Sequence, residues 1–237
     1  MGLWTLCLAA GYLMRVEMIA KGIECWLGDC RELLPYLVGK VDAVLTDPPY
    51  GIGEDGGRCR TRKGTKNPRI LRYGGWDNST PEKSVFDMIL ACGDEQIIWG
   101  GNYFSDKLPP SKGWLYWQKL MGGDFSDGEL AWTSRNRALR EFTKCPKGRD
   151  IEHPTQKPTE VMEWCLGFLP SAQTILDPFM GSGTTGVAAV KLGRKFIGIE
   201  IDEGYFNIAC RRISEALKQP DLFIEKPAPA KQEAFAL

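Results

Sequence analysis

Short apolar runs alternate along the chain with stretches in which apolar residues recur at helical spacing. Compact apolar runs bounded by turn residues predict buried strands. They occur at residues 23–29, 41–46, 95–101, 113–119, 128–134, 174–177 and 195–202. Helical spacing predicts helices at residues 80–93, 158–169 and 203–217, a shorter one at the end of the segment 174–193, and one or two turns at 30–37.

The order of these elements predicts an α/β fold, with a mostly parallel, doubly wound sheet that helices cover on both faces. The length of 237 residues suits one such domain. We expect this domain at residues 19–217, with an inserted region within about 51–150. Residues 1–18 are expected to be an N-terminal extension of uncertain order, since Met14 and Met18 offer later starts before the first convincing strand. A tail rich in Pro and Ala, at residues 218–237, is expected to be loosely ordered.

Composition narrows the function classes. Thirty Lys and Arg residues balance thirty Asp and Glu residues, so binding to nucleic acid would have to come from local basic patches. Eight cysteines without a CxxC pair and a single histidine argue against a zinc site, so we expect no metal. The cysteines are expected to be reduced core thiols of a cytoplasmic protein. The apolar N-terminal run is too short to span a membrane and lacks the basic start of a signal peptide.

The motif TDPPYG, from Thr46 to Gly51, ends one of the expected strands. Its two prolines have no backbone N–H to donate, so they cannot continue a strand ladder. Asp47 precedes the prolines and Tyr50 follows them. The motif therefore places a carboxylate, a rigid backbone and an aromatic ring at one strand tip.

A second strand tip carries DPFMGSGTTG, in which Gly181, Gly183 and Gly186 match G-x-G-x-x-G. The strand before this turn and the helix after it give the setting of a nucleotide-binding loop. Glu200 ends the next strand about 17 residues after Gly183, close to where an acid that binds ribose hydroxyls is expected. These features favour NAD or S-adenosylmethionine (AdoMet), and Asp177 favours AdoMet because it would repel a pyrophosphate. The alternative is a tight turn with a capped helix and no ligand.

The sequences DPPY and FMGSG occur together with LGDC at residues 27–30 and HPTQKP at residues 153–158. In this combination the chain, from about Ile23 to Leu217, resembles the amino-methyltransferases of DNA. The catalytic segment precedes the cofactor turn, which is similar to the order in the β class, in particular its solitary or phage-borne members. The resemblance implies a circularly permuted, Rossmann-like methyltransferase sheet, AdoMet as methyl donor, and a compact target-recognition region within about 51–150.

The resemblance also implies a reaction, namely methyl transfer to the exocyclic amine of a base that has left the duplex. Asp47 would accept a hydrogen bond from this amine, and the carbonyl of Pro48 would be a second acceptor whose direction the proline ring fixes. Pro49 would rigidify the turn, and Tyr50 would stack on the base. Either Asp47 or solvent would take the proton that the methylated amine loses.

The cofactor residues implied by the same resemblance surround the glycine turn. Asp177 would face the amino group of AdoMet, Glu200 would hold the ribose hydroxyls, and Lys157, with Thr155 and Gln156, would lie near the methionine carboxylate. The others are Phe179, Gly181, Gly183, Thr184 and Thr185 at the turn, Ile201 and Asp202 at the adenine ring, and Asp29 at the adenine amine. Lys157 could instead be a surface charge, and Asp29 and Asp202 could be helix caps.

Two basic clusters predict contact with the phosphates of double-stranded DNA, although a charge run is more often a solvated face. The first, directly after the catalytic tip, comprises Arg58, Arg60, Arg62, Lys63, Lys66, Arg69 and Arg72. In the second, which spans residues 135–149, Arg135 and Arg137 are the residues expected at the DNA.

The expected function is a site-specific DNA methyltransferase that acts on the N6 amine of adenine. A cytosine-N4 enzyme is the alternative, since only Asp47, where cytosine-N4 enzymes more often carry Ser, favours adenine. A non-catalytic DNA-binding module and an NAD oxidoreductase are weaker rivals, because DPPY and the glycine turn are intact and Asp177 disfavours NAD. A homodimer and a role in restriction–modification are compatible with the resemblance. It specifies neither the recognition sequence nor a partner nuclease.

Overall fold

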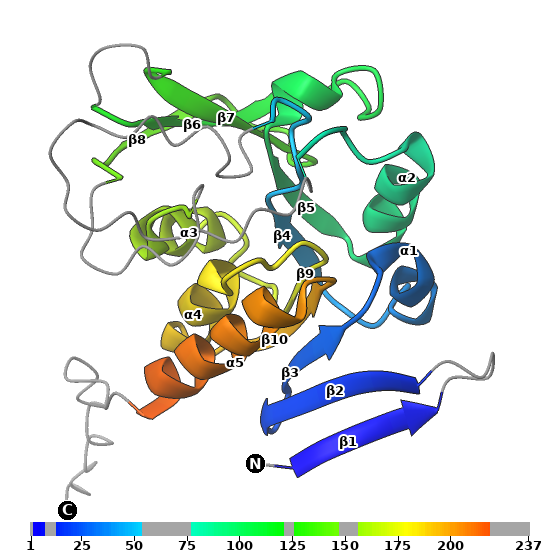
Figure 1. Ribbon diagram of the computed structural model, residues 1–237. Helices are drawn as coiled ribbons and strands as arrows, with labels where there is room; N and C mark the ends of the chain where they lie inside the picture. The colour runs from blue at the N-terminus through cyan, green and yellow to red at the C-terminus, as the bar shows by residue number, and fades with distance from the viewer. Residues whose placement is uncertain (1, 8–12, 54–76, 121–125, 147–155, 219–237) are drawn as a thin grey trace, which may run out of the picture.

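The computed structural model describes residues 2–7, 13–53, 77–120, 126–146 and 156–218, which form one ten-stranded sheet with helices on both faces (Figure 1). The strands are β1 (Gly2–Cys7), β2 (Leu13–Ala20), β3 (Ile23–Leu27), β4 (Ala43–Thr46), β5 (Glu95–Trp99), β6 (Gly113–Gln118), β7 (Gly128–Thr133), β8 (Arg140–Thr143), β9 (Thr174–Asp177) and β10 (Lys195–Glu200). The helices are α1 (Cys30–Leu33), α2 (Lys83–Cys92), α3 (Thr159–Leu166), α4 (Thr184–Lys191) and α5 (Glu203–Lys218), with the 3₁₀ turns η1 (Leu34–Tyr36) and η2 (Gly101–Phe104).

The strands follow the spatial order β1-β2-β3-β10-β9-β4-β5-β7-β6-β8. The five central strands, from β3 to β5, are parallel to one another. Antiparallel pairing attaches β2 to β3 at one side and β7 to β5 at the other. The prediction of an α/β fold is confirmed, and the parallel strands are concentrated in the centre of a mixed sheet.

Side chains of each central strand point alternately to the two faces of the sheet. In β4, Ala43 and Leu45 belong to the core beneath α3, α4 and α5, whereas Val44 belongs to the core beneath α1, η1 and α2. All three side chains are completely buried. Two apolar cores, one on each side of the sheet, therefore account for the doubly wound arrangement (Figure 1).

All predicted strands and helices are present, with ends that differ by a few residues. The sequence does not predict β8, because this strand lies inside a basic stretch and has mostly exposed residues, so no apolar pattern marks it. Residues 1–18, expected to be an extension of uncertain order, contribute β1 and most of β2, which pair as an antiparallel hairpin at one edge of the sheet.

The position of the functional site follows from the topology around β4 and β9. These strands are parallel neighbours, so their carboxyl ends meet at one edge of the sheet. From β4 the chain continues through α2 to β5 on one side, whereas from β9 it continues through α4 to β10 on the other. Such a change of direction leaves a crevice outside the strand ends, which is where open α/β sheets bind ligands.

Candidate active site

A pocket of about 480 Å³ lies at the carboxyl ends of β4 and β9. Its volume is in the range of small-molecule sites, which is roughly 300–1,000 Å³. Thr46 at the end of β4 donates a 2.7 Å hydrogen bond from its hydroxyl to Oδ1 of Asp177 at the end of β9. This bond ties the strand that carries DPPY to the strand that carries the glycine turn.

The pocket collects most of the site residues that the sequence predicts. Those that line it are Asp29, Asp47, Pro49, Lys157, Asp177, Phe179, Gly181, Thr184, Thr185, Glu200, Ile201 and Asp202. Gln156 also lines it. Pro48, Tyr50 and Gly183 are not part of the lining, although each adjoins a residue that is, or contacts one. The structure thus brings both predicted motifs to a single cavity.

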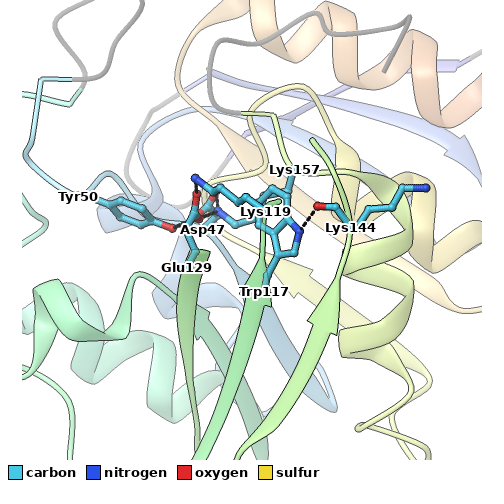
Figure 2. Close-up of polar contacts among 7 residues, drawn as sticks. All are labelled: Asp47, Tyr50, Trp117, Lys119, Glu129, Lys144 and Lys157. Carbon is cyan, nitrogen blue, oxygen red and sulfur yellow. Dashed lines mark hydrogen bonds and ion pairs between the residues drawn. The ribbon is translucent and has the colours of Figure 1, made fainter. Parts of the chain in front are cut away.

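At the tip of β4, the Asp47 carboxylate has partners on both of its oxygens (Figure 2). The Tyr50 hydroxyl donates to Oδ1 at 2.6 Å, and the ammonium group of Lys157 lies 2.5 Å from Oδ2. Lys157 also contacts Oε2 of Glu129, at 2.9 Å, and the other oxygen of Glu129 pairs with Lys119. Two carboxylates and two ammonium groups therefore alternate in one chain of contacts.

Burial and the neighbouring charges have opposite effects on the pKa values of Asp47, Glu129 and Lys157. Burial raises the pKa of Asp47 above its usual range, Lys157 opposes this rise, and the negative charge of Glu129 adds to it. Burial would also raise the pKa of Glu129, but Lys157 and Lys119 hold it at about 2. Burial would lower the pKa of Lys157, yet the two carboxylates raise it. Lys157 is consequently charged at neutral pH despite being buried.

The ring of Tyr50 packs against the segment that follows β5. It stacks on Tyr103, with ring centroids 4.9 Å apart and planes 16° apart, and meets Phe104 edge-on at 6.1 Å. A Cβ added to Gly100 would lie 2.1 Å from ring carbon Cε1 of Tyr50, so only glycine allows this approach. In the structure the ring is thus packed among protein groups, and its predicted stacking on a base stays a prediction.

The glycine turn takes its shape from two positions with positive φ. Gly183 has φ of +80° and precedes α4, and a Cβ there would lie 2.9 Å from Cβ of Ala209 in α5. The backbone N–H of Gly181, whose φ is +50°, donates to Oε2 of Glu200 at 2.9 Å. The turn is therefore pressed against α5 on one side and fixed to the end of β10 on the other.

Besides Asp47, two further carboxyl groups in the pocket have raised pKa values. Burial raises the pKa of Asp177 to about 6, against the lowering effect of hydrogen bonds from Thr185, Thr46 and the Phe179 backbone. Burial likewise raises the pKa of Glu200 to about 7, although backbone N–H groups donate to it. Carboxyl groups with perturbed pKa values in a pocket are typical of functional sites.

Asp29 and Asp202 have the capping role that was their alternative interpretation, and both also line the pocket. Asp29 is the N-cap of α1 and accepts from the Arg31 backbone N–H at 2.9 Å, while the Arg31 guanidinium pairs with its carboxylate. This pairing lowers the pKa of Asp29. Asp202 accepts from the backbone N–H of Tyr205 at the start of α5, at 2.9 Å.

The structure does not bring Arg135 and Arg137 to the pocket. Arg135 pairs with Glu95, the first residue of β5, and donates to the carbonyl of Phe168, so it lies at the opposite edge of the sheet from Asp47. The guanidinium of Arg137 lies over the Phe168 ring at 3.9 Å. All seven residues of the first basic cluster, between 58 and 72, lie outside the described residues, as does Thr155.

The sequence interpretation missed three charged residues that shape the site. Glu129 lies on β7, and Lys119 directly follows β6. Only the pairing of β7 with β5 brings these two residues to Asp47. Arg212 of α5 donates to the carbonyl of Ser182 at 2.5 Å and to the Ser182 hydroxyl at 2.9 Å, which holds the glycine turn from outside. For Glu129 the sequence offers one signal, since it is a charged residue in the otherwise apolar segment GELAW.

Comparisons with known proteins agree with this geometry. Residues 95–211 match a family model, N6_N4_Mtase, described as DNA methylase. Type II methyltransferase M2.LlaDCHI of Lactococcus lactis subsp. cremoris is 34% identical over 151 residues, which cover 62% of this chain and 52% of that protein. The chain spans about half the length of this relative and of two further similar Type II methyltransferases, M2.DpnII of Streptococcus pneumoniae and M2.MboI of Moraxella bovis.

Solved structures support the fold. A crystal structure of an M1.HpyAVI–SAM complex has a TM-score of 0.52 and 23% identity, covering 80% of this chain and 98% of that one. PvuII DNA methyltransferase, described as cytosine-N4-specific, has a TM-score of 0.52 and 16% identity, covering 79% and 85%. The predicted Rossmann-like methyltransferase fold is therefore confirmed. In sequence, residues 95–211 are similar to the N6/N4 DNA methylases, and the relatives at 33–34% identity are Type II methyltransferases.

Proposed function

We propose that the protein is a DNA methyltransferase that transfers a methyl group from AdoMet to the exocyclic N6 amine of adenine. The observation that carries this proposal is one pocket that Asp47 and Pro49 of DPPY share with the glycine turn, and whose acidic groups lie at the ends of β4, β9 and β10. Asp47 supplies the acceptor on the substrate side, and Glu200 and Asp177 supply acceptors on the cofactor side. The match of residues 95–211 to the DNA methylase family model supports the same reaction.

The pocket residues fit AdoMet in charge and in shape. Glu200 offers a carboxylate to the ribose hydroxyls, and Asp177 offers a buried carboxylate to the amino group. The absence of a side chain at Gly183 lets the turn pack closely against Ala209 of α5, and the neighbouring Gly181 lines the pocket. When bound, AdoMet supplies a sulfonium-linked methyl group that a nitrogen lone pair can attack.

The catalytic tip acts by orientation. An exocyclic amine is a weak nucleophile because its lone pair is delocalised into the ring, so acceptors aimed at its N–H bonds favour a pyramidal nitrogen. Within the described part of the chain, Oδ1 and Oδ2 of Asp47 each have one partner, so each oxygen keeps acceptor capacity for a substrate N–H. The Pro48 carbonyl, fixed by its ring, is the proposed second acceptor. Positioning of this kind supplies a large part of the rate in such reactions.

Double-stranded DNA is the proposed partner, and the region within about 51–150 is proposed to recognise the target sequence. The seven basic residues between 58 and 72 follow the tip directly in the chain and are proposed to contact phosphates. A homodimer and a cytoplasmic location, where DNA is present, are further expectations that accompany this proposal. Cytosine-N4 methylation stays the alternative, because the fold alone does not distinguish the two: PvuII DNA methyltransferase shares it.

Incubation of unmethylated DNA with labelled AdoMet, followed by nucleoside analysis, tests the proposal. N6-methyladenine is the expected product. N4-methylcytosine would replace the proposal by its alternative, and the absence of any methylated base, with DNA binding retained, would indicate a non-catalytic module. A variant with Arg58, Arg60 and Arg62 replaced by alanine should bind DNA more weakly and with a smaller salt dependence.

A further inference from the structure

The ammonium group of Lys157 has no N–H left for a ligand in this structure. Lysine has three N–H donors. Three acceptors lie within hydrogen-bonding distance: Oδ2 of Asp47 at 2.5 Å, Oε2 of Glu129 at 2.9 Å and the Tyr50 hydroxyl at 3.1 Å. The side chain is only 3% exposed, and its ammonium group lies 5.1 Å from the Trp99 ring centroid and 5.4 Å from that of Tyr50. Lys157 therefore belongs to the catalytic tip rather than to the methionine end of the cofactor pocket.

Glu129 completes this arrangement from outside the pocket. It reaches the tip because β7 runs antiparallel to β5, and it does not line the cavity. Its Oε1 pairs with Lys119, and its Oε2 faces both Lys157 and the Tyr50 hydroxyl, the latter at 3.1 Å. The Tyr50 hydroxyl has one hydrogen to donate, and Asp47, at 2.6 Å, is its closer acceptor. Glu129 therefore interacts mainly with Lys157 and Lys119.

We propose that Lys157 and Glu129 are positioning residues for Asp47: Lys157 holds the acceptor carboxylate in its ionised form, and Glu129 holds Lys157. This inference rests on the proposed function for its kinetic consequences, but not for its structural ones. A buried ammonium group needs opposite charges around it, and removal of one partner of a buried pair destabilises the remaining charge. With Glu129 in place, two carboxylates balance two ammonium groups.

The charged groups that face Asp47 determine the sign of each substitution. Lys157 favours the ionised carboxylate, whereas Glu129 and, across the strand ends, Asp177 disfavour it. Tyr50 donates to the carboxylate and favours ionisation. Glu129→Gln removes one negative charge, so Asp47 should ionise at lower pH. Lys157→Met removes the positive charge, so Asp47 should ionise at higher pH.

The first measurement is the pH dependence of methyl transfer. The pH at which activity is half lost on acidification should fall by on the order of one unit in Glu129→Gln and should rise in Lys157→Met. The matched control is Glu160→Gln, which breaks an exposed glutamate–lysine pair with Lys144 and leaves Asp47 untouched, so in this variant that pH should not change. Dissociation constants for AdoMet should stay within about twofold of the wild type for Glu129→Gln and Lys157→Met.

The second measurement needs no activity. Carbon-13 NMR titration of the Asp47 carboxyl, assigned with Asp47→Asn, should show the same two opposite displacements. If wild-type protein methylates no DNA, the proposed function fails, and this titration still tests the positioning role. Unmoved midpoints in both variants would overturn the inference, as would a loss of AdoMet binding of about tenfold or more in Lys157→Met, since that would return Lys157 to the cofactor. Because the two variants shift in opposite directions, a folding defect in one leaves the other informative.

Discussion

Tyr50 and Gly100 approach so closely that residue 100 has no room for a side chain: an added Cβ would lie 2.1 Å from Cε1 and 2.6 Å from Cδ1 of the ring. Gly100 also has φ of +73°, which side chains rarely adopt. Its place directly after β5 fixes where the Tyr50 ring can lie, and thereby where its hydroxyl meets Asp47.

Gly100→Ala should therefore displace the Tyr50 ring and lower methyl transfer by about tenfold or more, with little change in AdoMet affinity. Gly39→Ala is the control for backbone strain without a steric clash. Gly39 has φ of +69°, and an added Cβ there would have nothing within 4 Å. Both variants should lose similar stability from strain in a thermal melt, but only Gly100→Ala should lose activity. Equal activity of the two variants would contradict the role of Gly100.

Asp47→Asn should lower the rate of methyl transfer by about 10³-fold, since the amide keeps the size of the side chain but loses the charge and one acceptor. Binding of AdoMet, followed by calorimetry, should be retained, because Glu200 and Asp177 are unchanged. Near-wild-type turnover would show that the Pro48 carbonyl alone orients the amine.

Protein without ligand should lose stability as the pH rises from about 4.5 to 7.5. The folded-state pKa values of Asp177, about 6, and Glu200, about 7, lie above the ordinary carboxyl range. The folded state consequently binds more protons than the unfolded state within this window, so unfolding becomes easier as the pH rises through it. Denaturant melts at several pH values measure the slope, and Asp177→Asn should make it smaller. A slope of the opposite sign would mean that partners of these carboxyls outweigh their burial.

AdoMet should show the opposite dependence, because ribose hydroxyls donate best to an ionised Glu200. Its affinity should rise by up to about tenfold between pH 6 and pH 8. Glu200→Gln has no such titration, and comparison with it removes any change in the ligand's own charge. Parallel affinity profiles for the two proteins would place the ribose elsewhere.

Arg212→Ala should weaken AdoMet binding by several-fold, since its hydrogen bonds to Ser182 hold the glycine turn without reaching the ligand site. Arg211→Ala is the matched control, because Arg211 is the preceding residue on α5 and pairs with exposed Glu215 one turn away. Isothermal titration of both variants distinguishes an effect on the turn from a general effect on the helix. If both variants weaken binding equally, the hydrogen bonds from Arg212 to Ser182 have no specific role in holding the turn.

Local sequence predicts those parts of the site that one strand and its following turn create. DPPY and the glycine turn each have this form, so their backbone shapes and most pocket residues could be predicted. Glu129 could not, since its place beside Lys157 depends on antiparallel pairing with β5, for which the sequence between them gives no register. For Arg135 the sequence predicts DNA contact, which stays a prediction, but it does not predict the pair with Glu95 at the far end of β5.

The neighbouring positions of β4 and β9 also have a consequence for how the site comes into existence. The hydrogen bond from Thr46 to Asp177 closes a loop of 131 residues, and contacts of such long separation form slowly. A chain synthesised only as far as β5 already carries Asp47 and Asp29, yet it lacks Lys157, the glycine turn and Glu200. The order of the motifs along the chain thus delays assembly of the pocket until the second half of the domain has emerged.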